Sequence, residues 1–343
     1  MDDRRQAPSP LDPLGALLAG GRSVVLDGGL ATELEAQGAD LSDPLWSARL
    51  LVEDPGAIVR AHLAFFRAGA QVAITASYQA SFEGFARRGV DRGEAAGFLV
   101  RSVRLAQDAR AMALGERRES VPGTLLVAAS IGPYGAVLAD GSEYRGRYGL
   151  SIGALRDFHR DRMAALLSAG PDLLACETIP DLDEGHALVG LLAELGGAGW
   201  LSFTCSDGAR LRDGAPVEEA FALADESPGV LATGVNCTAP EFAIELVERA
   251  VAVTDKPVVI YPNSGEAWDG AGRRWVAPRP LATTEASMSV DTVGAVAARD
   301  VVDTVGAVAA RAWIAAGARL VGGCCRVTPA QIAEIAGVVD RAA

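Results

Sequence analysis

The chain has little positive charge and no long apolar run. Its 343 residues include 31 lysines and arginines against 44 aspartates and glutamates, which gives a formal net charge of −13. Surfaces that bind nucleic acid or anionic membranes draw on clustered basic side chains, so this balance argues against both partners and favours a small-molecule substrate. No apolar stretch approaches the ~18 residues of a membrane-spanning helix, and no apolar core with a cleavage site follows the first residues. We therefore expect a cytoplasmic protein.

Histidine and cysteine are scarce as well, with three and five residues respectively. His62, His159 and His186 fall in stretches that we expect to be helices on the outside of the fold, so they are expected to be solvated or locally paired. A histidine-rich zinc hydrolase is therefore disfavoured. An odd number of cysteines in a reducing compartment indicates thiols or metal ligands rather than disulfides.

Short apolar runs rich in β-forming residues alternate with amphipathic helical patterns along the chain. The clearest helical patterns cover residues 55–68, 94–113, 155–168 and 183–195. The eight expected strands are residues 24–26, 72–75, 125–130, 173–176, 200–204, 230–235, 258–261 and 318–321.

Eight consecutive β/α units without an antiparallel pairing signal predict an α/β fold of the (β/α)8 TIM-barrel type rather than an open doubly wound sheet. No Gly-x-Gly-x-x-Gly motif opens the first helix. We expect a single domain at residues 23–343, preceded by an N-terminal extension at residues 1–22. The protein is expected to be a monomer or a small homo-oligomer.

A direct repeat occupies residues 290–313, where the ten residues 290–299 recur as residues 302–311 at a spacing of 12. At 3.6 residues per turn the second copy is rotated by about a third of a turn, so the two copies cannot bury the same stripe of one straight helix. We expect the second copy to be the helix before the eighth strand. A solenoid needs at least three repeats, so we interpret the segment as a recent duplication.

Active sites of TIM barrels lie at the C-terminal ends of the strands. Two long loops leave that end, residues 135–149 with Tyr144, Arg145 and Tyr148, and residues 265–289 with Trp268 and Trp275, and we expect both to be lids. The chemically reactive or polar residues at the same strand ends are Asp27, Gln79, Glu177, Asn236, Cys237, Asn263, Cys324 and Cys325.

Three of the five cysteines follow expected strands, Cys237 after one and Cys324 with Cys325 after another. Neighbouring residues of an extended strand face opposite sides, so the pair can bind one metal only if the chain turns there, which the two glycines before it permit. A catalytic zinc keeps three protein ligands and leaves the fourth position open. The three cysteines therefore predict an open zinc site in preference to core thiols or a vicinal disulfide, whereas Cys176 and Cys205 are expected in the core.

Two acidic motifs also end strands, Asp27-Gly28-Gly29 and Glu177. Lone carboxylates are usually solvated or cap a helix, and Asp27 could simply pair with an arginine. Two acids and exposed glycine N–H groups at one rim would, however, suit an α-amino acid, with the carboxylates for its ammonium and the N–H groups for its carboxylate.

Eight short motifs are spread over most of the chain. They are DGGLATELE at 27–35, SYQAS at 77–81, GPYGA at 132–136, DGSEY at 140–144, ETIP at 177–180, NC at 236–237, YPNSGE at 261–266 and GGCCR at 322–326. Together they resemble the homocysteine S-methyltransferase family from about residue 23 to the C-terminus. The resemblance is closest to its short, cobalamin-independent members, which use S-methylmethionine or S-adenosylmethionine.

The resemblance implies a zinc-dependent methyltransferase that moves a methyl group from a sulfonium donor to the thiolate of L-homocysteine and forms methionine. Zinc coordination deprotonates a thiol, and a sulfonium is a good leaving group, so no general acid is required. The departures are the repeat and Val327, where a threonine is more familiar. The implied residues are Cys237, Cys324 and Cys325 for Zn²⁺, with substrate contacts from Asp27, Gly28, Gly29, Gln79, Glu177 and Asn236.

Two alternatives stay open. The same zinc site could serve betaine or another amine-based donor, or selenocysteine as the acceptor. A non-catalytic barrel could bind zinc for metal storage or redox sensing. Cobalamin-dependent transfer from folate is disfavoured because no residues remain for those modules, and Tyr144, Trp268 and Trp275 are the candidates for a donor pocket that favours positive sulfur.

Overall fold

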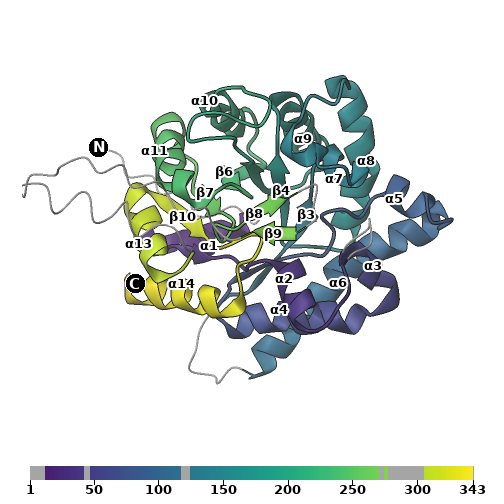
Figure 1. Ribbon diagram of the computed structural model, residues 1–343, viewed down its shortest axis with the longest axis horizontal. Coiled ribbons are helices and arrows are strands. Elements are labelled where there is room, and N and C mark those ends of the chain that lie inside the picture. The colour runs from purple at the N-terminus through teal and green to yellow at the C-terminus, as the bar shows by residue number, and fades with distance from the viewer. Residues whose placement is uncertain (1–11, 42–46, 117–123, 270–273, 277–304, 343) are drawn as a thin grey trace, which may run out of the picture.

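The computed structural model describes residues 12–41, 47–116, 124–269, 274–276 and 305–342 (Figure 1). Eight strands form one sheet of parallel neighbours in the order β1-β10-β7-β6-β5-β4-β3-β2, and an isolated parallel bridge between Leu26 and Val72 joins its two ends into a barrel. The strands are β1 (Val24–Val25), β2 (Val72–Ile74), β3 (Leu126–Ile131), β4 (Leu173–Ile179), β5 (Gly199–Phe203), β6 (Val230–Asn236), β7 (Val258–Tyr261) and β10 (Ala318–Val321). All eight expected strands and the TIM-barrel fold are confirmed.

Successive residues of each strand face the barrel interior and the surrounding helices in turn. In β4, Leu173 and Ala175 pack inside the barrel with Trp200 of β5, while Leu174 and Cys176 pack in the outer core against the helices. Because both faces are buried, the strands read as continuous apolar runs. The same alternation places Glu177 on the inner side at the end of β4.

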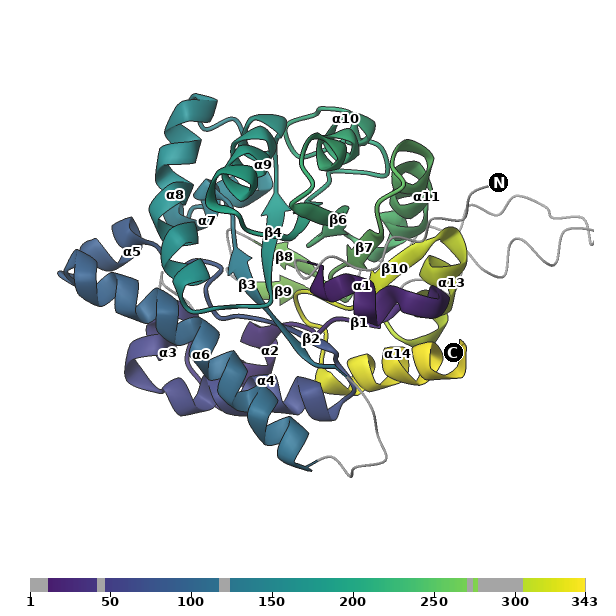
Figure 2. The same ribbon diagram turned by 180° about the vertical axis from the view of Figure 1, so that it is seen from behind.

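The helices form the outer layer around the barrel (Figures 1 and 2). The four expected helical patterns correspond to α4, α6, α8 and α9, and Asp54, Ser151 and Asp181 cap three of them by accepting a backbone N–H of the first turn. The long outer helices are α4 (Pro55–Arg67), α6 (Arg92–Glu116), α8 (Ile152–Ser168), α9 (Leu182–Leu195), α11 (Ala243–Val253), α13 (Ala307–Ala316) and α14 (Pro329–Ala342). Shorter helices are α1 (Pro13–Leu18), α2 (Leu30–Ala36), α3 (Ser47–Glu53), α5 (Phe82–Ala86), α7 (Tyr134–Leu138) and α10 (Val217–Ala222).

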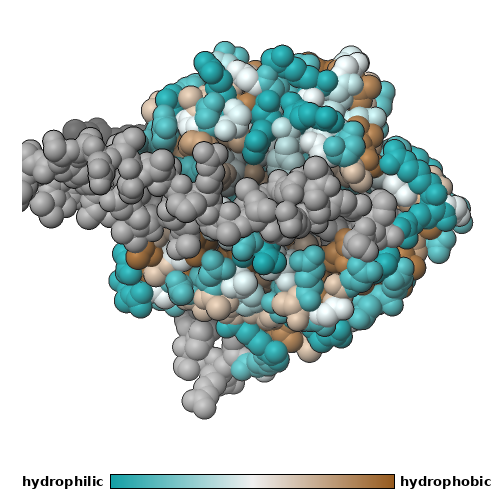
Figure 3. All heavy atoms as spheres, in the orientation of Figure 1, coloured by the Kyte–Doolittle hydropathy of each residue, from teal (hydrophilic) through white to brown (hydrophobic). Residues whose placement is uncertain are grey.

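Hydrophilic residues cover most of the outer helices on the face in Figure 3. The larger exposed apolar side chains, such as Val52, Met112 and Val251, come from different helices. Within the described residues, every helix is either too short or too polar to cross a membrane.

Helix α1 lies at the N-terminal end of the barrel, where Figure 2 shows it in front of the strands. Its Leu14 and Leu17 are buried in the same apolar cluster as the inward-facing strand residues. Arg319 of β10 holds the following turn by donating to the carbonyl oxygens of Leu18 and Arg22, at 3.2 and 2.6 Å. The described part of the segment expected to be an extension therefore packs as the floor of the barrel.

The second copy of the repeat leads into α13, which begins at Ala307 and precedes β10 as expected. The first copy, residues 290–301, lies outside the described residues. The loop expected at 265–289 contains an antiparallel pair, β8 (Ala267–Asp269) with β9 (Arg274–Val276). The eight β/α units pair in parallel as expected, and this additional pair was not predicted, because strands of three residues carry too little alternation to be seen in the sequence.

The three histidines were expected to be solvated or locally paired. His62 contradicts this expectation, whereas His159 is buried but paired with Glu184 at 2.8 Å. His62 on α4 and His159 on α8 have no exposed surface, whereas His186 on α9 is half-exposed and lies 3.5 Å from Glu226. A helix of a barrel packs on the sheet and on both neighbouring helices, so its buried face is wider than a single apolar stripe. Among the described residues, neither ring nitrogen of His62 has a hydrogen-bond partner, and burial lowers the pKa of His62 to about 4.

His62 should make the fold sensitive to mild acid. Its pKa is about 4 in the folded protein and about 6.5 in the unfolded chain, so the unfolded chain binds more protons between these values and stability falls as the pH is lowered. Between pH 7.5 and pH 5 the free energy of unfolding of the wild type should therefore fall by about 2 kcal/mol more than that of His62→Leu. Urea unfolding at both pH values measures this difference.

The matched control is His186→Leu, on the half-exposed side of α9. As a substitution at a half-exposed position, it should change the free energy of unfolding at pH 7.5 by no more than about 0.5 kcal/mol. Equal pH dependence of the wild type and His62→Leu would contradict the burial of a neutral imidazole.

Candidate metal and substrate site

Three cysteine sulfurs meet at the C-terminal end of the barrel. Cys237 follows β6, and Cys324 and Cys325 follow β10. The Sγ atom of Cys325 lies 4.0 Å from that of Cys237 and 4.0 Å from that of Cys324, and all three sulfurs lie within 4.8 Å of one another. Among the histidine, cysteine and acidic side chains of the described residues, these three cysteines lie close enough together to share one metal ion.

The turn that carries Cys324 and Cys325 is fixed by its backbone. Cys324 N–H donates to Pro262 O at 2.8 Å, and Cys325 O accepts from Ser264 N–H at 3.0 Å, so the turn after β7 holds both residues. Arg326 takes a left-handed conformation with φ of 67° and ends the turn. Both cysteines can thus face one point although they are adjacent in sequence.

The glycines near this turn are needed because a side chain would not fit there, and not because the backbone takes a left-handed conformation. Neither Gly322 nor Gly323 has a positive φ. A Cβ atom on Gly322 would lie 2.7 Å from the Cβ of Leu26, and one on Gly29 would lie 2.7 Å from Cys324 O. The first and eighth strands can therefore approach closely enough to bring the Asp27 motif against the cysteine turn.

The cluster fits a zinc ion by distance and by donor type. Two sulfurs bound to one tetrahedral zinc at about 2.3 Å lie about 3.8 Å apart, close to the 4.0 Å seen here. Thiol donors from Cys324 and Cys325 lower the pKa of Cys237. The pKa values of Cys324 and Cys325 are raised, first because each neutral thiol is hydrogen-bonded to Cys237, and then by burial and by negative charge on Cys237. Ionisation of all three thiols at neutral pH therefore requires a bound cation. Thiolates are soft ligands of the kind that suits zinc.

Asp27 is buried at the end of β1 beside this turn. Its Oδ2 accepts the Ile74 N–H at 2.8 Å and so continues the pairing between the first two strands, while its Oδ1 has no hydrogen-bond partner among the described residues. Burial raises the pKa of Asp27, and the nearby Glu177 raises it further. A buried acceptor oxygen without a donor indicates a position for a ligand that carries N–H groups.

Glu177 ends the inner row of β4 and is also buried. One of its oxygens accepts the Ser130 hydroxyl, and the other accepts the Tyr261 hydroxyl at 3.0 Å. Burial raises the pKa of Glu177 to about 7. The barrel interior thus holds two carboxyl groups, Asp27 and Glu177, near the sulfurs. Among the described residues, neither carboxyl group is bonded to a basic side chain.

Asn236 has a different position from the one expected of a substrate contact. Its side chain is fully buried, and its Oδ1 accepts from Thr178 N–H at 2.7 Å and from the Ser202 hydroxyl at 2.9 Å. Its Nδ2 donates to the Thr178 hydroxyl at 2.7 Å. Thr178 has a φ of 61°, which is costly for a β-branched residue, so the Asn236 amide supports the strained turn after Glu177.

Gly29 of the Asp27 motif differs from expectation. Gly29 N–H donates to Val327 O at 2.9 Å, so it is not free for a substrate carboxylate. Gly28 packs against Phe65, where a Cβ atom would lie 2.7 Å from the ring. Both glycines therefore allow close packing, and a substrate contact through the Gly28 N–H group stays a prediction.

Three further buried oxygens at this end of the barrel lack a donor in the described part of the chain. They are Gln79 Oε1, Glu143 Oε2 and Asn263 Oδ1. The Gln79 amide is held at its other end, where Nε2 donates to Ala136 O at 3.4 Å. Glu143 was not identified from the sequence, although it lies inside the DGSEY motif.

Tyrosines border the sulfurs. The pKa of Tyr144 is raised by burial and then by negative charge on Cys237, Cys325 and Cys324, which places its phenol beside the cluster, and the loop that carries it lies at the rim as expected. The pKa of Tyr78 is raised by burial, then by negative charge on Tyr144 and on Cys237, and Tyr78 was not singled out from the sequence. Arg212 lies over the Tyr144 ring, 5.4 Å from its centroid, and was also missed because an isolated arginine in a loop gives no pattern.

The remaining cysteines lie away from the cluster, as expected. Cys176 and Cys205 are buried, and burial raises the pKa of each thiol to about 12. Both therefore remain protonated core residues.

Comparison with known proteins matches residues 24–339 to the family model described as homocysteine S-methyltransferase. The homocysteine S-methyltransferase of Escherichia coli K12 is 47% identical over 94% of this chain and 97% of its own length, and the homocysteine S-methyltransferase YbgG of Bacillus subtilis 168 is 45% identical over 95% and 97%. The crystal structure of the metallated E. coli homocysteine methyltransferase MmuM superposes with a TM-score of 0.79 at 45% identity, covering 95% of this chain and 99% of that one. The chain therefore belongs to the homocysteine S-methyltransferase family of enzymes.

Proposed function

We propose that this protein transfers a methyl group from a sulfonium donor, S-methylmethionine or S-adenosylmethionine, to the sulfur of L-homocysteine and so forms methionine. The observation that carries the proposal is the cluster of three sulfurs within 4.8 Å, beside two buried carboxyl groups at one end of the barrel. The names of the relatives and the metallated form of the E. coli structure support the same chemistry.

Cys237, Cys324 and Cys325 would hold the zinc ion. A free thiol with a pKa near 8.5 is only a few per cent ionised at neutral pH, and bound zinc would supply the positive charge that keeps the homocysteine sulfur deprotonated. A sulfur lone pair then forms the new S–CH3 bond while the donor S–CH3 bond breaks, and the donor leaves as a neutral thioether. The thiol proton passes to solvent, so the step needs no general acid.

Asp27 and Glu177 would bind the homocysteine ammonium. Asp27 Oδ1 lacks a donor, and burial raises the pKa of both carboxyl groups in the absence of a nearby cation. An ammonium group would stabilise both carboxylates and satisfy the unpaired oxygen. Asn236 would act behind them by holding Thr178, with Gly28 and Gly29 providing the close packing of the cysteine turn.

The unpaired acceptors favour an amino-acid donor over betaine. Gln79 Oε1, Glu143 Oε2 and Asn263 Oδ1 each need an N–H or O–H group, and a buried acceptor left without one costs about 1–3 kcal/mol. S-methylmethionine and S-adenosylmethionine bring an ammonium group as well as the sulfonium. Betaine carries no N–H group that could satisfy these oxygens.

Parallel assays of methionine formation from homocysteine test both the reaction and the donor. S-methylmethionine should be used well, dimethylsulfoniopropionate, a sulfonium without an ammonium group, should show at least a tenfold lower kcat/KM, and betaine should give no product above background. Metal analysis of the same sample should find one zinc per chain. Equal use of betaine would overturn the donor assignment, and zinc without any methionine would favour the redox-sensing alternative.

A further inference from the structure

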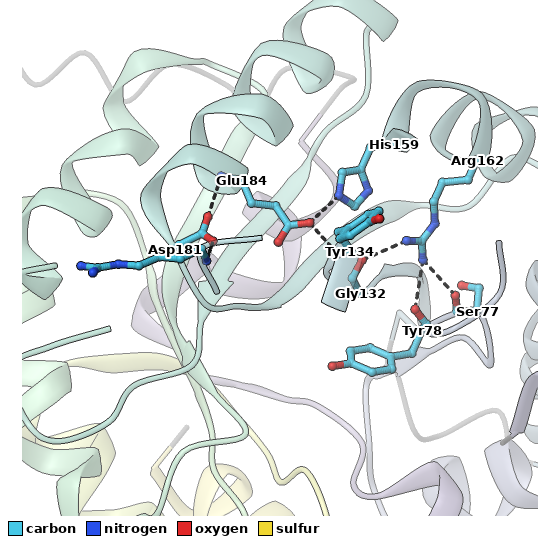
Figure 4. Close-up of polar contacts among 9 residues, drawn as sticks. Ser77, Tyr78, Gly132, Tyr134, His159, Arg162, Asp181 and Glu184 are labelled. Atoms are coloured by element: carbon cyan, nitrogen blue, oxygen red, sulfur yellow. Dashed lines mark hydrogen bonds and ion pairs between the residues drawn. The ribbon is translucent and has the colours of Figure 1, made fainter. Parts of the chain in front are cut away.

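Two buried residues of opposite charge lie behind the rim of the barrel on neighbouring helices. Arg162 on α8 and Glu184 on α9 have no exposed surface. Within the described residues Arg162 makes no direct ion pair, and its donors go to backbone carbonyl groups (Figure 4). Burying a guanidinium in this way is costly, so its position depends on the backbone contacts that it makes.

Arg162 joins the turns that follow β2 and β3. Its Nη1 donates to Gly132 O at 2.9 Å, and its Nη2 donates to Tyr78 O at 3.0 Å and to Ser77 O at 3.3 Å. Burial lowers the pKa of Arg162 to about 10, so it stays charged at neutral pH. The planar fork of arginine can hold carbonyl oxygens from two segments at once, which a lysine ammonium cannot do with the same geometry.

Glu184 holds the same turn after β3 from the other side. Its Oε1 accepts Tyr134 N–H at 2.6 Å, at the start of α7, and lies 2.8 Å from His159 Nε2 (Figure 4). Gly132 and Tyr134 are two residues apart, so the positive side chain holds a carbonyl group of the turn and the negative side chain holds an N–H group. The pair matches its charges to the dipoles of one segment.

The segments fixed in this way carry the two tyrosines beside the sulfurs. The Tyr78 ring packs on Gly132, where a Cβ atom would lie 2.6 Å from the ring, and it points away from Arg162 in Figure 4. The start of α7 packs on the turn that precedes Tyr144, because a Cβ atom on Gly135 would lie 2.5 Å from Glu143 N. Movement of the turn after β3 would therefore displace both Tyr78 and Tyr144.

We propose that Arg162 and Glu184 are positioning residues for the methyl donor, which set the Tyr78 and Tyr144 rings against its positive sulfur. The inference rests on the proposed function, because it assumes a sulfonium donor next to the cysteines. Aromatic faces attract a cation within about 6 Å, and a misplacement of about 1 Å in a reacting pair can cost about 100-fold in rate. Among the described residues, the hydrogen bonds of Arg162 and Glu184 go to residues other than Asp27 and the three cysteines of the cluster.

The test uses variants of similar size and a matched control pair. Arg162→Lys should raise the KM for S-methylmethionine at least tenfold, and Glu184→Gln at least threefold, while the KM for homocysteine and the zinc content stay within twofold of the wild type. Arg156→Lys and Glu194→Gln are the controls, because Arg156 and Glu194 form a half-exposed ion pair of 2.7 Å between the same two helices. Both controls should keep the wild-type KM for the donor.

Calorimetric binding of S-methylmethionine to the metal-free protein decides the inference without turnover. Weaker binding by Arg162→Lys at an unchanged melting temperature supports it, and binding equal to the wild type overturns it. An equal rise in both KM values together with loss of zinc would also overturn it, since the pair would then serve only the fold. A wild-type enzyme that binds the donor but forms no methionine would refute the proposed function alone.

Discussion

Replacement of Cys237 by serine is expected to lower the rate of methionine formation by more than about 100-fold and to leave the purified protein with less than one zinc per chain. The serine hydroxyl is not ionised at neutral pH, so one of the three ligands is lost and the neighbouring sulfur atoms, 4.0 Å apart, remain as a pair. Loss of a residue that only supports a metal ligand already costs 10–100-fold in affinity or activity, and loss of a ligand should cost more. Metal analysis and a homocysteine assay on one preparation measure both effects.

Cys176→Ala and Cys205→Ala are the controls for this prediction. Both residues are buried cysteines of the same protein, but their sulfurs lie in the outer core rather than at the cluster. Each variant should keep one zinc per chain and a rate within about threefold of the wild type, with a modest loss of stability of about 1 kcal/mol. Full zinc content and activity in Cys237→Ser would refute the assignment of the metal site.

Asp27→Asn is expected to raise the KM for homocysteine by about 10–100-fold, which corresponds to about 1.5–3 kcal/mol for a hydrogen bond to a charged group. Asparagine keeps an oxygen that can accept the Ile74 N–H, so the closure of the barrel should survive, but it lacks the negative charge that an ammonium needs. Zinc content and melting temperature should stay close to the wild type. Steady-state kinetics with homocysteine as the varied substrate measures the effect.

Two further variants separate substrate binding from barrel closure. Asp27→Ala also removes the acceptor for Ile74 N–H and should lower the melting temperature in addition to raising the KM. Asp172→Asn is the matched control, because Asp172 Oδ2 accepts the Val127 N–H of β3 at 2.7 Å at the opposite end of the barrel. An unchanged KM in Asp27→Asn, or an equal rise in Asp172→Asn, would contradict the proposed ammonium contact.

The strands and the cysteine cluster were predictable because they depend on short-range pattern and on one general property of parallel barrels. Strands buried on both faces appear as apolar runs, and the C-terminal ends of all of them meet at one rim. Cys237 and Cys325 are separated by 88 positions, yet their place directly after two such runs was enough to bring them together.

The roles of individual polar residues were harder to predict. Asn236 was expected to touch substrate as one of the polar residues at the ends of the expected strands, but its amide is bonded to Thr178 and Ser202 from the two preceding strands. Gly29 was expected to offer a free N–H group, but Val327 accepts it. Hydrogen bonds between residues so far apart along the chain leave no periodic signal in the sequence.

The sequence by itself determined the eight-stranded barrel, the rim at which the site lies and the three thiols that meet there, because each depends on local alternation and on order along the chain. Only the tertiary structure decided which side chains at that rim are free for a ligand and which are already bonded. It also decided that His62, His159, Arg162 and Glu184 are buried, because burial on a barrel helix depends on the neighbouring helices packed against it. Those contacts join segments that are distant in sequence, and they exist only once the barrel has closed.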